Sequence, residues 1–188
     1  LNCGIIYIMN LFVLDKDPVI AAQMHCNKHV PKMIVESAQM LSTAHRMLDG
    51  AEERRPSNSG KTMSRYWVLP DEREDTYYKA VHMHHPCTVW TARSLENYRW
   101  HWKLFDALCK EYTYRYGKLH KSDEVLRKDL FYGPANIANG PLTKWPLAMK
   151  SNPECMFDDV VKSYRAFYKT KQERFKMVWT KRSTPDWF

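Results

Sequence analysis

The residues best suited to chemistry in this chain fall into two stripes at helical spacing. Each stripe repeats every three or four positions, so a helix would present its members on one face. The first stripe consists of His25, His29, Lys32, Glu36 and Gln39. The second stripe consists of Trp90, Arg93, Ser94, Asn97, His101, Leu104 and Leu108. Because buried polar side chains are unfavourable without partners, the polar start of the second stripe predicts a pocket there.

Side chains of these types favour anion binding and proton transfer. Arg93 would hold a phosphate or carboxylate with its guanidinium fork, and Glu36 would orient a group or act as a base. The residues predicted to be catalytic are Glu36, His29, Lys32 and His85. The residues predicted to bind substrate are His25, Lys28, Trp90, Arg93, Asn97 and His101. Two alternatives stay open: an internal Arg–Glu ion pair that only fixes packing, and a first stripe that faces solvent.

Two long helices would position these stripes. Asp17-Pro18 is typical of a helix start, and the pattern predicts a helix to Asp49 that is bent or restarted at Pro31. A second helix is predicted from Pro86 or Thr88 to Tyr116, without interruption before Gly117. We expect the two helices to pack together around one pocket. The residues expected to face each other across it are His29, Lys32 and Glu36 on one side and His85, Arg93 and Asn97 on the other.

The remaining segments complete a mainly α prediction. The polar stretch 51–65 is predicted to be a mobile loop, and residues 131–153, rich in proline and glycine, an irregular arm. Short helices are predicted at 76–82 and 123–130, and a terminal helix at 158–179. The predicted fold is a single compact helical domain over residues 9–188 with two long core helices, the arm and a basic C-terminal helix. Residues 1–8 are interpreted as an upstream extension before Met9.

The composition is that of a folded protein. Of the 188 residues 44% are hydrophobic and 13% aromatic, which excludes a disordered chain. The sequence contains no apolar run near the ~20 residues that span a bilayer, so we expect no membrane partner. Five scattered cysteines without a C-x-x-C pattern indicate a reducing cytoplasm, that of a host if the protein is viral.

The net charge of +8 is concentrated at the C-terminal end. Residues 160–188 hold eight basic side chains against two acidic ones, and aromatic residues alternate with them. Nucleic-acid binders use this composition, with cations for phosphates and rings for bases. The residues predicted to bind nucleic acid are Lys169, Lys171, Arg174, Lys176, Lys181 and Arg182. The alternative is a terminal amphipathic helix with a solvated basic face.

The histidines and cysteines do not predict a metal site. His82, His84 and His85 are neighbours in sequence, but zinc needs a second ligand pair of recognisable spacing, which the sequence lacks. Neither Cys26 nor Cys87 lies in a pattern typical of a nucleophilic cysteine. We therefore predict no metal and no cofactor.

Several stretches resemble a family of conserved, largely uncharacterised proteins of tailed phages. These stretches are Asn10–Pro18, His25–Leu41, the block His85-Pro86-Cys87 with Trp90 and Arg93–Tyr98, Gly140–Thr143, Tyr164–Tyr168 and Trp179 with Pro185–Phe188. The resemblance covers nearly all of residues 9–188, but it implies membership and no established activity.

A weaker resemblance is to the small helical pyrimidine-dimer DNA glycosylases of phages and bacteria. Those enzymes attack a damaged deoxyribose with an N-terminal α-amine while a helix glutamate assists. Glu36 would match that glutamate, and His85-Pro86 the family's His-Pro element. Asn10 after Met9 should hinder removal of the initiator methionine, so the amine would be that of Met9. With residues 1–8 present, Lys32 or Lys28 would have to act instead as an unprotonated amine.

These observations predict an enzyme that acts on DNA or nucleotides, in its most specific form a pyrimidine-dimer-type glycosylase and lyase. The alternative is a non-catalytic helical module of a phage that binds nucleic acid or a host protein. The oligomeric state is left open by the sequence.

Overall fold

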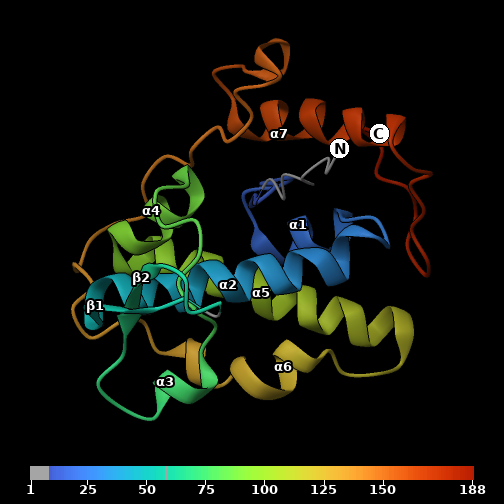
Figure 1. The fold of residues 1–188 in the computed structure, drawn as a ribbon. Helices are drawn as coiled ribbons and strands as arrows, with labels where there is room; N and C mark the ends of the chain where they lie inside the picture. Colours follow the sequence, from blue (N-terminus) through green and yellow to red (C-terminus); the bar gives the residue numbers. More distant parts are fainter. Residues whose placement is uncertain (1–8, 58) are drawn as a thin grey trace.

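Two long helices, α2 (His29–Asp49) and α5 (Leu95–Tyr116), pack against each other at the centre of the computed structural model (Figure 1). The structure describes residues 9–57 and 59–188, so the predicted upstream extension lies outside the described residues. Two shorter helices pack on this pair: α1 (Pro18–Met24) on α5, and α4 (Pro86–Arg93) on α2. The mainly α fold and the packing of the two predicted helical regions are thus confirmed.

The first helical region is interrupted earlier than predicted. The Asp17 side chain accepts the N–H groups of Val19 and Ile20, so α1 begins at Pro18 as expected. The backbone at His25 is extended, and the helix restarts at His29. Pro31 lies in the first turn of α2, where its missing N–H costs no hydrogen bond, so it causes neither a bend nor a restart.

The second helical region is broken at Ser94, and the prediction of one continuous helix is wrong. Ser94 has extended backbone angles (φ −150°, ψ 156°), and its side chain accepts the Asn97 N–H to begin α5. Two hydrogen bonds from the break to the arm stabilise this extended conformation. Ser94 Oγ donates to the Pro141 carbonyl, and the Leu95 N–H donates to that of Ala138. Because the extended residue changes the direction in which the following side chains point, residues of α4 and residues of α5 do not share one helical face.

The segment predicted to be a mobile loop is largely an antiparallel hairpin. Strand β1 (Ala51–Pro56) pairs with β2 (Met63–Val68), with Arg54 opposite Arg65. All of β1 is exposed, so neither face supplies the apolar alternation from which a strand is recognised. Gly50 separates the hairpin from α2. A Cβ at Gly50 would lie 2.5 Å from the Arg46 carbonyl oxygen, which explains the glycine.

The predicted irregular arm is confirmed between two 3₁₀ turns, Asp129–Phe131 and Pro153–Cys155, with neither helix nor strand in between. The short helix predicted at 76–82 is wrong, because α3 (Arg73–Thr76) ends where that helix was expected to begin; the one predicted at 123–130 is found shifted toward the N-terminus, as α6 (Lys121–Leu126). In Figure 1, α6 and α3 lie on one side of the central pair and α7 (Val160–Lys169) lies on the other. None of the helices in residues 9–57 and 59–188 is long and apolar enough to cross a bilayer.

The predicted terminal helix is much shorter than expected. After α7 the chain forms a 3₁₀ turn, Thr170–Glu173, and then runs without regular structure to Phe188. It is still attached to the body of the protein: Trp179 Nε1 donates to the Met24 carbonyl at 2.8 Å. Most of the basic residues of this region therefore lie beyond the helix rather than on one helical face.

Candidate functional site

A cavity of about 460 Å³ opens beside the N-terminal half of α2. Three of its lining residues, spaced along one face of α2, belong to the first polar stripe predicted from the sequence. These residues are Lys32, Glu36 and Gln39. Val35 of α2 also lines it, and the other walls come from the N-terminal segment through Met9 and from the loop before α4 through Val81 and His82. We refer to this space as the Glu36 cavity.

Glu36 is the most unusual ionisable group of the cavity. Its side chain is only 5% exposed, and Oε2 accepts the Asn10 N–H at 3.2 Å. Oε1 lies 3.3 Å from Lys32 Nζ but has no hydrogen bond within the described residues. Burial raises the pKa of the Glu36 carboxyl, and the nearby Lys32 ammonium only partly offsets this. The carboxyl group thus retains an unused acceptor beside an amine.

The N-terminal segment is held rigidly against Glu36. The buried Asn10 side chain accepts the N–H groups of Leu11 and Phe12 and donates to the Ala148 carbonyl at 3.0 Å. These bonds direct the Asn10 N–H to the carboxylate of Glu36. The sequence interpretation assigned no function to Asn10, although an asparagine within an apolar segment is the kind of signal that could have indicated one.

His82 brings a third chemically active side chain to the cavity. Its backbone is left-handed (φ 47°), which is uncommon for residues other than glycine. The loop is anchored next to it, where the Val81 N–H donates to Thr43 Oγ1 at 3.1 Å and the His85 N–H to the His82 carbonyl. The sequence interpretation considered His82 only as a metal ligand and missed it as a cavity residue.

His25 and His29 are not among the described residues that line the cavity. His29 stacks on Phe12 at 5.3 Å and meets the edges of Tyr168 and Phe175. Burial lowers the pKa of His29 to about 2 and that of His25 to about 4, so both are neutral at pH 7. They belong to an aromatic cluster between α2 and α7, which explains their burial without chemistry.

Asn97 and His101 of the second stripe form hydrogen bonds within the fold, Asn97 to the arm and His101 to α4. Asn97 Nδ2 donates to the Trp90 carbonyl and to Thr143 Oγ1, and Asn97 Oδ1 accepts the Thr143 N–H. His101 Nδ1 lies 2.7 Å from Thr91 Oγ1, and burial lowers the pKa of His101 to about 3. Since Asn97 and His101 are bonded within the fold, the prediction that Asn97 faces Glu36 is wrong.

Arg93 and His85 do not meet Glu36 either. Arg93 is the last residue of α4, before the break at Ser94, and its side chain is exposed. Glu36, in contrast, is buried beside Lys32. His85 Nδ1 accepts the Cys87 N–H at 3.2 Å at the start of α4, so this ring is a helix cap. The predicted pocket between the two stripes is therefore absent from the described residues, and only the α2 side of it exists as the Glu36 cavity.

Half of the predicted nucleic-acid contacts are bound within the protein. Lys171 Nζ lies 3.5 Å from the Phe167 ring centre, and burial lowers the pKa of Lys171 to about 8. Lys181 Nζ donates to the Tyr114 carbonyl, and Arg182 pairs with both carboxylate oxygens of Glu111. The exposed members of the predicted set are Lys169, Arg174, Lys176 and Lys181, and the side chains of the first three form no bond within the described residues. Lys28, also exposed, lies over the Phe175 ring.

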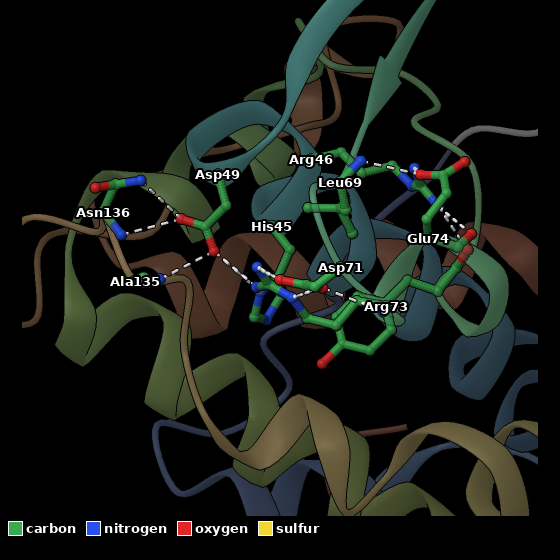
Figure 2. A network of polar contacts seen from close by, with 10 residues as sticks. His45, Arg46, Asp49, Leu69, Asp71, Arg73, Glu74, Ala135 and Asn136 are labelled. Carbon is green, nitrogen blue, oxygen red and sulfur yellow. Dashed lines mark hydrogen bonds and ion pairs between the residues drawn. The ribbon is translucent and has the colours of Figure 1, made fainter.

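A second polar network lies at the other end of α2 (Figure 2). The fully buried Arg46 guanidinium donates to every acceptor around it. Those acceptors are the carbonyl oxygens of Trp67, Glu74, Tyr77 and Tyr78 and the Glu74 carboxylate. Beside it, Arg73 bonds the carboxylates of Asp49 and Asp71 at 2.7 Å each. This network joins α2, β2 and α3, and the sequence interpretation missed it.

His45 in the same network is a neutral structural residue. The Tyr98 hydroxyl donates to the Leu130 carbonyl, so it accepts from His45 Nε2 at 2.9 Å. Nδ1 is then free to accept from Arg73 at 3.1 Å. Burial lowers the pKa of His45 to about 4, in agreement with this tautomer.

Within the part of the chain that the structure describes, no three histidine, cysteine, aspartate or glutamate side chains gather to hold a metal ion. The described cysteines, Cys26, Cys87, Cys109 and Cys155, are buried and free. Comparison of the chain with protein-family models, with curated proteins and with solved structures gave no match.

Proposed function

We propose that the protein is an enzyme that acts on DNA and excises a base with an amine nucleophile in the Glu36 cavity. The observation that carries this proposal is a buried carboxyl group with a raised pKa, 3.3 Å from a lysine amine, in a cavity of about 460 Å³. Cavities of this size hold small ligands such as a nucleotide. The net charge of +8 and the exposed Lys169, Arg174 and Lys176 suit a polyanionic substrate.

The Lys32–Glu36 pair supplies the first step. In this step we assign Lys32 as the amine nucleophile and Glu36, 3.3 Å away, as the group that exchanges protons with it, so the reacting pair is a free amine beside a carboxylic acid. The amine attacks C1′ of a deoxyribose. The new N–C1′ bond replaces the bond to the base, which leaves with its electron pair and takes up a proton.

Glu36 serves the following steps in both protonation states. As the acid it protonates the sugar ring oxygen, and the ring opens to a protonated imine on the lysine. As the carboxylate it removes a proton from C2′, and the 3′ phosphate departs with the strand break. Water then hydrolyses the imine and restores the lysine.

The test is to trap the imine. The full chain is incubated with ultraviolet-damaged and with abasic duplex DNA in the presence of borohydride, and a covalent protein–DNA adduct is expected on a denaturing gel. Lys32→Met and Glu36→Gln should both lose strand cleavage, whereas Lys118→Met, which replaces an exposed lysine in the turn after α5, should keep it. The absence of both adduct and cleavage with the unaltered protein would eliminate the proposal.

Peptide mapping of the reduced adduct identifies the amine. We expect the modification on Lys32. Met9 also lines the cavity, so a chain that begins at Met9 would bring its α-amine to the same place. An adduct on that amine in such a chain would retain the cavity and the role of Glu36 but would replace Lys32 as the nucleophile.

The second candidate is a non-catalytic module that binds nucleic acid or a host protein. It is favoured by the internal bonding of Asn97 and His101 and by the neutral, packed state of His25 and His29. This candidate predicts salt-sensitive binding that survives Glu36→Gln and Arg93→Ala without any strand cleavage.

A further inference from the structure

Two adjacent aromatic side chains are largely exposed to solvent, although residues of this size are usually buried. Phe131 ends a 3₁₀ turn and Tyr132 follows it, and the two are 53% and 72% exposed. Their rings meet edge to face at 5.1 Å, and Phe131 meets the edge of Trp102 at 4.9 Å. Exposed aromatic clusters of this kind are typical of binding surfaces, because burial of such rings against a partner is strongly favourable.

A groove of about 550 Å³ runs beside these rings, which we call the aromatic groove. Its aromatic wall is formed by Trp102, Phe131 and Tyr132, and its charged lining residues are Arg99 and Lys103 of α5. Gly133 allows the chain after the rings to lie close to α5. A Cβ at Gly133 would lie 3.2 Å from Leu95 Cδ1 and 3.4 Å from Tyr98 Cδ1.

The cations at the groove differ in how they are engaged. Arg99 pairs with Glu96 at 2.7 Å on the surface of α5. Lys103 and, on the other side of the rings, Lys128 are exposed and form no ion pair within the described residues. An anion in the groove thus meets the paired Arg99 and the unpaired Lys103, while Lys128 lies beyond the rings beside Asp129.

The groove is preorganised. Trp102 Nε1 donates to the Arg127 carbonyl at 3.1 Å, which fixes the indole ring. The turn beneath is tied to α5, because the Tyr98 hydroxyl donates to the Leu130 carbonyl at 2.8 Å and Leu130 is fully buried. A rigid aromatic wall loses little conformational entropy on binding.

We infer that the aromatic groove binds an unpaired stretch of a nucleic-acid strand. A base stacks on the Phe131 and Tyr132 rings while its flanking phosphates contact Lys103 and Lys128. Charge selects this occupant: a second copy of the chain also carries +8 and would be repelled, whereas a polyanion is attracted. An unpaired strand is required because bases inside a duplex have their faces covered. The inference needs no catalysis and rests on a surface separate from the Glu36 cavity.

The experiment measures binding of a short fluorescent oligothymidylate to the full chain by anisotropy at several salt concentrations. Tyr132→Ala and Phe131→Ala should each weaken binding about tenfold, as loss of one stacked base does. Lys103→Ala and Lys128→Ala should each reduce the salt dependence by about 0.7 in slope. Tyr132→Phe should bind like the unaltered protein, because it keeps the ring.

Two matched controls lie elsewhere on the surface. Phe157 is 37% exposed with Lys162 Nζ 4.4 Å from its ring centre, so Phe157→Ala removes a comparable aromatic–lysine pair at the start of α7. Lys118→Ala removes an exposed lysine from the turn after α5. Neither should change the affinity by more than about twofold. A strand of the same length without bases should bind equally to Tyr132→Ala and to the unaltered protein.

Three results would overturn the inference. One is an affinity for oligothymidylate that Tyr132→Ala leaves unchanged or that Phe157→Ala weakens as much. Another is a preference for fully paired duplex over the single strand. The third is self-association that Tyr132→Ala abolishes without any strand binding, which would assign the groove to a second copy. Glu36→Gln should bind the strand normally while it loses cleavage, so failure of the groove and failure of the proposed enzyme are distinguishable.

Discussion

Both ends of α2 bury charge, but they do so in opposite ways. At the C-terminal end the Arg46 guanidinium has five hydrogen bonds, and its carboxylate partner Glu74 is also bonded by Lys79 and by the Leu69 N–H. Near the N-terminal end the Glu36 carboxyl has one hydrogen bond from Asn10 and one ion pair, and it borders a cavity. Burial alone therefore does not distinguish a structural charge from a chemical one.

The pKa values of the two carboxyls express this difference. Burial opposes the ionisation of both. At Glu74, the hydrogen bonds from Lys79, Leu69 and Arg46 outweigh burial and lower the pKa to about 2. At Glu36 burial prevails over Lys32 and the Asn10 N–H, and the pKa is raised. A saturated carboxylate remains ionised and stabilises the fold, whereas an unsaturated one is suited to exchange protons.

The largest predicted effect is that of Arg46→Met. The substitution removes the Arg46 donor from four carbonyl groups and the buried cation from the Glu74 carboxylate, so we expect a loss of about 3–5 kcal/mol in unfolding free energy. Urea denaturation measures it. Arg55→Met is the control, because Arg55 forms an exposed pair with Glu53 at 2.7 Å and should cost under about 1 kcal/mol. Equal losses of unfolding free energy in the two variants would contradict the assignment of Arg46 as a structural residue.

Glu36→Gln should have a small effect on the unfolding free energy, and the effect should depend on pH. The folded-state pKa of Glu36 is raised above 4.5, so its stabilising contribution is present below pH 4.5 and is lost as the pH rises through the folded pKa. Relative to the unaltered protein, the variant should therefore gain stability from acid to neutral pH while it loses strand cleavage. Thermal melts over this range measure the trend.

Glu74→Gln should show the reverse trend. The stability due to the Glu74 carboxylate is present above pH 4.5 and is lost as the pH falls toward about 2. The variant should be clearly less stable than the unaltered protein at neutral pH and should approach it in acid. If the two glutamine variants followed the same pH trend, the assignment of one carboxyl as structural and the other as chemical would be wrong.

His29→Phe should make the protein less sensitive to mild acid. The folded-state pKa of His29 is about 2, below its ordinary 6.5, so its contribution is present above pH 6.5 and is lost as the pH falls below it. A phenyl ring fits between Phe12 and Tyr168 without titrating. Melting temperatures should therefore fall less below pH 6.5 than in the unaltered protein. His84→Phe, in an exposed loop, controls for the added ring and should not share this effect.

The sequence predicted the features that depend on local residues, such as those that begin or end a helix. Asp17-Pro18 begins a helix and Gly117 ends one, with φ of 68° at the glycine. It also predicted the Lys32–Glu36 side of the cavity, because a spacing of four residues places both on one face. What it missed depends on distant partners. The Ser94 break is held by the carbonyls of Ala138 and Pro141 in the arm.

Arginines show the same limit. Arg46 and Arg93 both lie in the last turn of a helix, where a cation is favourable on any surface helix. Nothing local indicates that Arg46 is buried under β2 and α3 while Arg93 is exposed. The periodicity placed Arg93 toward the core only because it assumed an unbroken helix across Ser94. Sequence patterns thus identify which residues share a face within one helix, but they do not predict how the faces of two successive helices are oriented relative to each other.

The smallest predicted effect is the coupling between Arg93 and Glu36. Since Arg93 is exposed and Glu36 pairs with Lys32, Arg93→Ala should cost under about 1 kcal/mol, and its effect should add to that of Glu36→Gln within about 0.5 kcal/mol. A cycle between Lys32→Met and Glu36→Gln should instead be non-additive, because these groups are 3.3 Å apart. Coupling in the first cycle comparable to that in the second would restore the pocket between the two stripes and contradict the separation of Arg93 from the Glu36 cavity.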